Sequence, residues 1–333
     1  MKILFIGGTV FLGRATVEAA LARGHEVTLF NRGRSDPDAY PQVERLRGDR
    51  DGHLDALQGR TFDAVVDTCG YVPRVVRQSA QLLADAVDRY VFISSLSAYA
   101  EPSAVGATED APLAQMPEGT SEDVEEVTGE TYGPLKVLCE EQVEQALPGR
   151  ALLIRPGLIV GPCDRTDRFT YWPWRAAQGG EILAPGRPER GVQFIDVRDL
   201  GQWIVHLLET GKAGAYSAAT APMPMRDLLE SCVSVSESDG TLTWVDDAFL
   251  LEREVGMWME MPLWIPESDP VAAGFFSYSN AKAVKDGLTF RPLDDTVQAT
   301  LDWARTFAGD HEWRAGMKAE REAKILEEWK ERA

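Results

Sequence analysis

The chain has 333 residues, of which 44% are hydrophobic and 26% are charged, a composition typical of a globular protein and too apolar for a disordered one. Its formal net charge of -19 would repel phosphate backbones and anionic lipid, so we expect neither nucleic acid nor a membrane as partner, and an anionic small ligand would need a local positive pocket. The chain shows no signal-peptide pattern and no apolar run of membrane-spanning length, so we expect a cytoplasmic protein. Its four cysteines and four histidines lack metal-ligand spacing, so we expect no metal site and no disulfide framework.

The first half of the chain alternates apolar, strand-like runs with segments whose apolar residues recur at helical spacing. We expect strands at residues 2–7, 25–32, 62–70, 89–95 and 150–160, and helices at residues 14–24, 74–87 and 136–147. This alternation predicts an α/β fold with a doubly wound, mostly parallel, Rossmann-type sheet. We assign residues 1–161 to that domain, with a return segment near residues 192–210. Residues 162–333 are assigned mainly to a smaller C-terminal substrate-binding domain.

Three later segments break this alternation. Residues 101–131 contain nine acidic residues and no Lys or Arg, which predicts a long solvated loop, either a surface insertion or a lid over a site. Aromatic residues gather at residues 168–175 and 257–267, where we expect core packing, with some side chains lining a pocket. Residues 311–332 predict a charged amphipathic helix that docks onto its own subunit.

The turn GGTVFLG, residues 7–13, lies directly between the first strand and the first helix, which is the context of a dinucleotide-binding turn. In such a turn the first glycine permits the bend, a middle glycine lets the backbone approach the pyrophosphate, and the last lets helix and strand pack closely. Gly7 and Gly13 fit the first and last roles, whereas Val10 stands where a glycine is usual. The helix N-terminus would present N–H groups to the phosphates. The expected contacts within the turn are Gly7, Thr9, Val10, Phe11, Leu12 and Gly13.

The second strand ends in FNRGR, where sites that prefer NAD(H) usually carry an acidic residue. Here Asn31 is neutral, and Arg32 and Arg34 are cationic. Because a guanidinium suits a 2′-phosphate, the sequence favours NADP(H), with NAD(H) as the alternative cofactor. The two arginines could equally be exposed loop charges.

The candidate catalytic residues lie in two segments, SSLSAY at residues 94–99 and YGPLK at residues 132–136. Tyr132 and Lys136 are four apart, so on a helix they share one face, and Pro134 falls in the first turn, where a proline is tolerated. A phenol is a poor base at neutral pH, so a nearby ammonium would help to favour the phenolate. A YxxxK match alone is weak, but its place after the fifth strand strengthens it.

Taken together, the motifs resemble those of the extended short-chain dehydrogenases/reductases, of the NAD-dependent epimerase/dehydratase type. The motifs, in chain order, are GGTVFLG, GDR at residues 48–50, VVDTCG, SSLSAY, YGPLK, RPGLIVGP and FIDVRDL at residues 194–200. The resemblance implies that Ser95 hydrogen-bonds the reacting oxygen, that Tyr132 is the general acid/base, and that Lys136 holds the nicotinamide ribose and lowers the pKa of Tyr132. It also implies further cofactor contacts at Asp49, Arg50, Thr68, Cys69, Gly70, Ser94, Pro156, Ile159 and Val160. A homodimer is typical of the family.

One departure from the family bears on the substrate. Relatives that act on nucleotide sugars usually carry an arginine two residues before the FIxV segment, and Val192 stands there in this chain. Arg187, Arg190 or Arg291 could substitute for it. Together with the aromatic segments, the departure favours a small, largely apolar carbonyl substrate over a charged nucleotide sugar.

The expected function is therefore NAD(P)-dependent oxidoreduction of a carbonyl or secondary alcohol, in an atypical, reductase-like member of the family. One alternative is an epimerase or dehydratase with transient oxidation, for which Glu130 and Cys163 are candidate acids or bases by position. Another is a non-catalytic dinucleotide-binding sensor or scaffold.

Overall fold

The computed structural model describes residues 1–121, 124–307 and 311–332. Its largest element is a seven-stranded sheet in the order β11-β6-β5-β4-β1-β2-β3, and every strand pairs parallel to its neighbours. The strands are β1 (Lys2–Ile6), β2 (Glu26–Asn31), β3 (Glu44–Arg47), β4 (Phe62–Asp67), β5 (Val87–Ile93), β6 (Ala151–Pro156) and β11 (Gly214–Ala218). This arrangement confirms the predicted Rossmann-type α/β fold.

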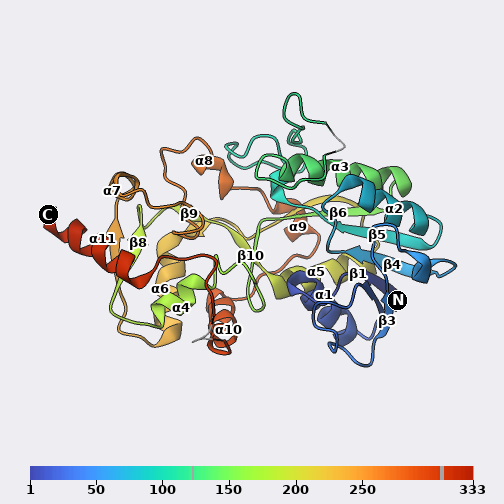
Figure 1. The fold of residues 1–333 in the computed structure, drawn as a ribbon, viewed down its shortest axis with the longest axis horizontal. Helices are drawn as coiled ribbons and strands as arrows, with labels where there is room; N and C mark the ends of the chain where they lie inside the picture. Colours follow the sequence, from blue (N-terminus) through green and yellow to red (C-terminus); the bar gives the residue numbers. More distant parts are fainter. Residues whose placement is uncertain (122–123, 308–310, 333) are drawn as a thin grey trace.

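Helices cover both faces of the sheet, because its strands are apolar on both sides (Figure 1). Alternate residues of β1 separate the two layers. Ile3 and Phe5 pack with α1 (Phe11–Ala22) and α5 (Val197–Glu209), whereas Leu4 and Ile6 pack with α2 (Pro73–Leu83) and α3 (Tyr132–Ala146). β2 and β3 follow β1 on one side of it in the sheet, whereas β4 and the later strands lie on its other side. The strand order therefore reverses beside β1. Ligands of such sheets bind at the carboxyl ends of the strands at this reversal.

The sheet with α1, α2, α3 and α5 forms what we call the sheet lobe, and a second lobe lies beside it along the long axis of the molecule (Figure 1). The second lobe has its own apolar core, which includes the fully buried Trp172 and Trp264. Its elements are α4 (Tyr171–Ala176), β8 (Glu181–Pro185), α6 (Met225–Ser236), β13 (Thr241–Val245), α7 (Asp247–Glu252), α10 (Leu293–Arg305) and α11 (Ala319–Glu331).

The remaining elements are short. β7 (Leu158–Val160) pairs with β10 (Phe194–Asp196), and β9 (Gly191–Val192) pairs with β12 (Met223–Pro224). Helices α8 (Ala272–Phe275) and α9 (Ala281–Lys285) complete the set, together with the 3-10 turns η1 (Asp55–Leu57) and η2 (Leu96–Ala98). The return segment predicted near residues 192–210 contains α5, but the chain rejoins the sheet only at β11, beyond that range.

The predictions for the later segments agree with the structure in part. Residues 101–131 form no helix and no extended strand in the part that the structure describes, and residues 122 and 123 lie outside that part. The C-terminal helix is α11, shorter than predicted, and it docks onto the second lobe by burying Ile325 and Leu326. Within the described ranges, no helix is both long and apolar enough to cross a membrane.

Candidate active site

A cavity of about 1010 Å³ opens at the carboxyl ends of β1, β4 and β5, and both lobes line it. The sheet lobe lines the cavity with the turns that follow these strands. On the side of the second lobe, the cavity is lined by loop residues such as Trp258 and Phe276. The cavity brings together almost all of the residues singled out from sequence, which are Gly7, Thr9, Val10, Phe11, Leu12, Gly13, Asn31, Arg32, Arg34, Asp49, Arg50, Thr68, Cys69, Ser94, Ser95, Tyr132, Lys136, Pro156 and Ile159. Such a volume lies at the upper end of the range for small-molecule pockets.

Two expected cofactor contacts, Gly70 and Val160, do not line the cavity, and those assignments are corrected. Gly70 is buried, and a Cβ there would lie 2.4 Å from the ring of Phe92. Val160 is fully buried in the core of the second lobe, because its side chain points to the opposite face of β7 from that of Ile159. Motif position alone did not show which way these residues face.

The glycine turn keeps the shape that the sequence predicts. Gly7 has φ 106°, and a Cβ there would lie 2.6 Å from Oγ1 of Thr68, so only glycine fits. A Cβ on Gly13 would lie 2.9 Å from the backbone of Gly8, which is the close approach of helix and strand expected at the last glycine. Val10 has φ -129° and ψ 134°, an extended conformation open to any residue. The valine therefore does not distort the turn, and α1 begins at Phe11 with no side-chain cap on its N–H groups.

Beside the glycine turn, the side chain of Asn31 fixes the loop that follows β2. Its Oδ1 accepts hydrogen bonds from the N–H of Gly33 at 2.9 Å and from Arg47 at 2.6 Å, and its Nδ2 donates to the carbonyl of Gly7 at 3.1 Å. Arg32 lies 3.8 Å from the carboxylate of Asp49. Arg34 is exposed and forms no ion pair with any described residue, so its guanidinium is free for a ligand.

Arg50 reaches the cavity wall, but its guanidinium is committed to a buried ion pair. It donates to both carboxylate oxygens of Asp67 at 2.7 Å and to the hydroxyl of Ser79 at 2.8 Å. Asp67 also accepts a hydrogen bond from the N–H of Cys69 at 3.2 Å. The ion pair of Arg50 and Asp67 therefore fixes the turn that follows β4.

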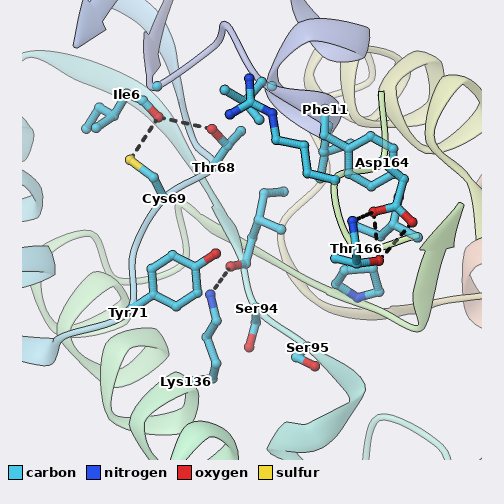
Figure 2. A pocket seen from close by; sticks show the side chains of 18 of the residues that line it. Ile6, Phe11, Thr68, Cys69, Tyr71, Ser94, Ser95, Lys136, Asp164 and Thr166 are labelled. Carbon is cyan, nitrogen blue, oxygen red and sulfur yellow. Dashed lines mark hydrogen bonds between the residues drawn. The ribbon is translucent and has the colours of Figure 1, made fainter. Parts of the chain in front are cut away.

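Lys136 is almost completely buried, with 4% of its surface exposed, although its expected role requires a charge. Its Nζ donates to the carbonyls of Gly70 at 2.7 Å and Ile93 at 2.9 Å, and it lies 4.4 Å from the centre of the Tyr71 ring (Figure 2). No carboxylate of the described residues pairs with it. Burial therefore lowers the pKa of Lys136 to about 8.

Tyr132 begins α3 one helical turn before Lys136, as the sequence predicts, with Pro134 in the first turn. Burial raises the pKa of the Tyr132 phenol, while the Ser95 hydroxyl and the positive charge of Arg168 act in the opposite direction. Ser95 accepts a hydrogen bond from the N–H of Ser97 at 3.1 Å and donates to its hydroxyl at 3.2 Å. The hydroxyl of the neighbouring Ser94 is buried without a partner in the same wall. In this state Tyr132 is a protonated phenol, able to donate a proton.

The cavity also contains residues that the sequence did not single out individually. Figure 2 shows Asp164 and Thr166 beside Phe11, across the view from Tyr71 and Lys136. Arg168 follows on the same loop, and Tyr278 lies on the segment after α8. No local motif marks these positions; the signal available was the aromatic enrichment, which supplies Trp258 to the cavity and Trp172 and Trp264 to the core.

The three arginines suggested as substitutes for the family's arginine lie outside the cavity lining. Arg187 pairs with Glu267, Arg190 donates to the carbonyl of Ile265 at 2.6 Å, and Arg291 pairs with Asp199, so none lines the cavity. Val192 is fully buried in the second core. Neither Glu130 nor Cys163, the candidate extra acids or bases, lines the cavity either. Arg187, Arg190 and Arg291 are held by the partners named above, and the lining of the cavity does not support the roles considered for Glu130 and Cys163.

Comparison with known proteins identifies the family. Residues 3–219 match the model of the NAD dependent epimerase/dehydratase family, so the chain belongs to that family. Over 228 residues it is 25% identical to a curated relative, the chloroplast stem-loop binding protein of 41 kDa b of Arabidopsis thaliana. That match covers 64% of this chain and 56% of the plant protein, so it spans little more than half of the relative's length.

Solved structures share the fold over nearly the whole chain. The UDP-glucuronic acid 4-epimerase of Bacillus cereus, solved in complex with NAD, has a TM-score of 0.65 at 17% identity. The UDP-Glc/GlcNAc 4-epimerase of Campylobacter jejuni has a TM-score of 0.68 at 16% identity. Each comparison covers 92% of this chain and 99% of the other. At these identities the likeness establishes the fold alone.

The burial of Lys136 predicts a pH-dependent stability. Its pKa falls from about 10.4 in the unfolded chain to about 8 in the folded one. Between these two pH values the unfolded state binds more protons than the folded state, so the free energy of unfolding rises with pH. The full cost of burying the ammonium is present below the pKa of the folded state and decreases as the pH rises above it. We expect the free energy of unfolding of the wild type, relative to Lys136→Met, to increase by ~2 kcal/mol between about pH 7 and about pH 9.5.

Urea denaturation at the two pH values measures this difference. The matched control is Lys285→Met, because Lys285 is exposed and should give a difference that does not vary with pH. A wild-type minus Lys136→Met difference that stays constant or falls with pH would contradict the burial of an ammonium at this position.

Proposed function

We propose that the protein is an oxidoreductase that uses a nicotinamide dinucleotide, with NADP(H) preferred, to interconvert a carbonyl and a secondary alcohol on a small molecule. The observation that carries the proposal is the convergence of Ser95, Tyr132 and Lys136 in the same cavity as the glycine turn. Membership of the NAD dependent epimerase/dehydratase family supports the cofactor class.

The cavity fits a dinucleotide at three points. The uncapped N–H groups at the start of α1 suit a pyrophosphate, and the bend at Gly7 gives it room. The buried Ser94 hydroxyl has no protein partner and is available to a group held beside it. At the far end, Arg34 is an unpaired donor able to meet a 2′-phosphate. The bound nicotinamide would supply or accept the hydride.

The proton chemistry falls to Tyr132. In the reductive direction, the hydride adds to the carbonyl carbon while the phenolic proton moves to the carbonyl oxygen, leaving a phenolate. The hydroxyl of Ser95 would donate a hydrogen bond to that oxygen, and the ammonium of Lys136 would stabilise the phenolate. Burial makes both electrostatic effects stronger than they would be in water.

The family match and the epimerase neighbours favour a second candidate, an epimerase or dehydratase in which the hydride returns to the substrate. Such a reaction runs with catalytic rather than stoichiometric cofactor. Glu130 and Cys163, the candidate extra acids or bases for such a reaction, do not line the cavity, so its lining supports neither residue in that role. The aromatic lining by Trp258, Phe275 and Phe276 supports a substrate with an apolar part.

Replacing the phenol tests the proposed chemistry. We expect Tyr132→Phe to lower kcat for reduction by NADPH by ~10²-fold or more, because the variant lacks the proton donor. Its affinity for NADPH should change by less than about 3-fold, since the hydroxyl alone is removed. The assay follows NADPH oxidation with a panel of ketones, aldehydes and enones.

Tyr99→Phe is the matched control, because its hydroxyl contacts Ser217 at 2.7 Å outside the cavity, and it should retain activity. If the wild type oxidises NADPH no faster than Tyr132→Phe with every compound, the reductase proposal fails. Turnover with only catalytic cofactor would instead support the epimerase or dehydratase candidate.

Cofactor preference is tested at Arg34. We expect Arg34→Ala to weaken NADPH binding by ~10-fold or more and to leave NADH binding within about 2-fold, because a charged hydrogen bond to the 2′-phosphate is lost. Fluorescence titration gives both dissociation constants. Arg60→Ala, which removes an exposed arginine paired with Glu44, should change neither value. An equal loss for both cofactors in Arg34→Ala would contradict the 2′-phosphate assignment.

A further inference from the structure

Arg168 is a cation in the cavity wall with no anionic partner. It is half-buried, and among the described residues no carboxylate lies within ion-pair distance of its guanidinium. Its one hydrogen bond runs from Nε to the hydroxyl of Thr166 at 3.2 Å, so the two terminal nitrogens remain available. Burial lowers the pKa of Arg168, and the charges of Asp164 and Tyr132, which act in the opposite direction, do not cancel this effect.

The loop that carries Arg168 is fixed by its own contacts. Asp164 is 1% exposed, and both of its carboxylate oxygens face Thr166, which approaches them through its hydroxyl at 2.8 and 2.9 Å and through its N–H at 2.9 Å (Figure 2). Asp167 is fully buried and accepts a hydrogen bond from the N–H of Arg314 at 2.9 Å. Asp164 forms no ion pair with Arg168, and its charge offsets only part of the effect of burial on the pKa of the guanidinium.

Aromatic side chains pack beside the Arg168 guanidinium. The central carbon of the guanidinium, Cζ of Arg168, lies 5.2 Å from the centre of the Trp258 ring. Trp258 has φ 68°, a left-handed conformation that is rare for a bulky residue and is typical of side chains held at a binding site. Its ring packs edge-on against Phe275 at 5.1 Å and is tilted against Phe276 at 6.1 Å. All three rings line the cavity next to the charge.

We propose that Arg168 is the binding site for an anionic group, a carboxylate or a phosphate, on a substrate whose apolar part packs against Trp258, Phe275 and Phe276. The inference rests on the proposed function, which makes this end of the cavity the place of reaction. Arg168 and Tyr132 line the same cavity, so the anionic group would be held in the cavity that contains the phenol. In a chain with a net charge of -19, a half-buried cation with no ion-pair partner among the described residues is the local positive pocket that an anion requires.

The cofactor pyrophosphate is the rival ligand for this charge. The N-terminus of α1 already offers it free N–H groups at the glycine turn. The contact of Arg168 with Trp258 places the guanidinium at the junction of the two lobes, on the side that the apolar wall occupies. A single anionic group beside an aromatic surface also differs from the diphosphate of a nucleotide sugar, for which the arginine position is the buried Val192.

The test uses benzoate, phenyl phosphate and neutral benzamide as probes, titrated calorimetrically into the full-length protein with and without saturating NADP⁺. We expect at least one anion to bind ~10-fold or more tightly than benzamide, because a charge-assisted hydrogen bond is added. The tighter of benzoate and phenyl phosphate identifies the group as a carboxylate or a phosphate. Arg168→Gln should abolish the advantage of the anion, and Arg168→Lys should keep part of it.

Arg187→Gln, in the second lobe but outside the cavity, is the matched control and should keep the full advantage. Equal binding of anions and benzamide by the wild type, or an anion advantage that survives in Arg168→Gln, overturns the proposal. A 10-fold or greater loss of NADP⁺ affinity in Arg168→Gln also overturns it, because the charge would then serve the cofactor. Failure of the wild type to bind any dinucleotide contradicts the proposed function instead, and the titrations without NADP⁺ still decide the role of Arg168.

Discussion

The position of the whole candidate site depends on how one buried ammonium is held. Among the residues that the structure describes, no carboxylate pairs with Lys136; it donates instead to the carbonyl of Gly70, after β4, and to that of Ile93, the last residue of β5. These two bonds tie α3 to the carboxyl ends of adjacent strands. Because Tyr132 lies one helical turn earlier, the same bonds aim the phenol into the cavity. An ammonium in this position is costly for folding, and the cost is consistent with a chemical role.

The sequence predicted the central strands of the sheet and missed its edges. β1, β2, β4 and β6 lie within the predicted ranges, because strands buried on both faces are largely apolar. β5 begins at Val87, two residues before the predicted strand and inside the range predicted as a helix. β3 and β11 are the two outer strands. β3 reads ERLR and has no fully buried residue, and β11 reads GAYSA and begins with a glycine at φ 90°. β3 is mostly charged, and β11 consists mainly of small residues although its last three residues are buried, so neither sequence has a comparable apolar signal.

The candidate site likewise has one half that the sequence predicted and one half that it missed. Its sheet-lobe half lies in turns that directly follow strands, so the local motifs around Gly7, Ser95 and Tyr132 were enough to find it. The half nearer the second lobe comes from loops distant in sequence, and only the tertiary structure brings Arg168 beside Trp258. Motif position also could not tell that Val160 faces a core or that Arg50 is held by Asp67. The sheet-lobe residues that line the cavity were therefore predictable from sequence, whereas those near the second lobe were not.

The central claim is that the cavity binds a nicotinamide dinucleotide whose ribose is held by Lys136, and titration of the purified protein with NADPH tests it most directly. The account predicts saturable binding of one NADPH per chain, followed by the fluorescence of the nicotinamide, and a dissociation constant that rises by ~10-fold or more in Lys136→Met, where the charged donor is lost. Absence of saturable binding by the wild type, or equal affinity in Lys136→Met, would contradict it.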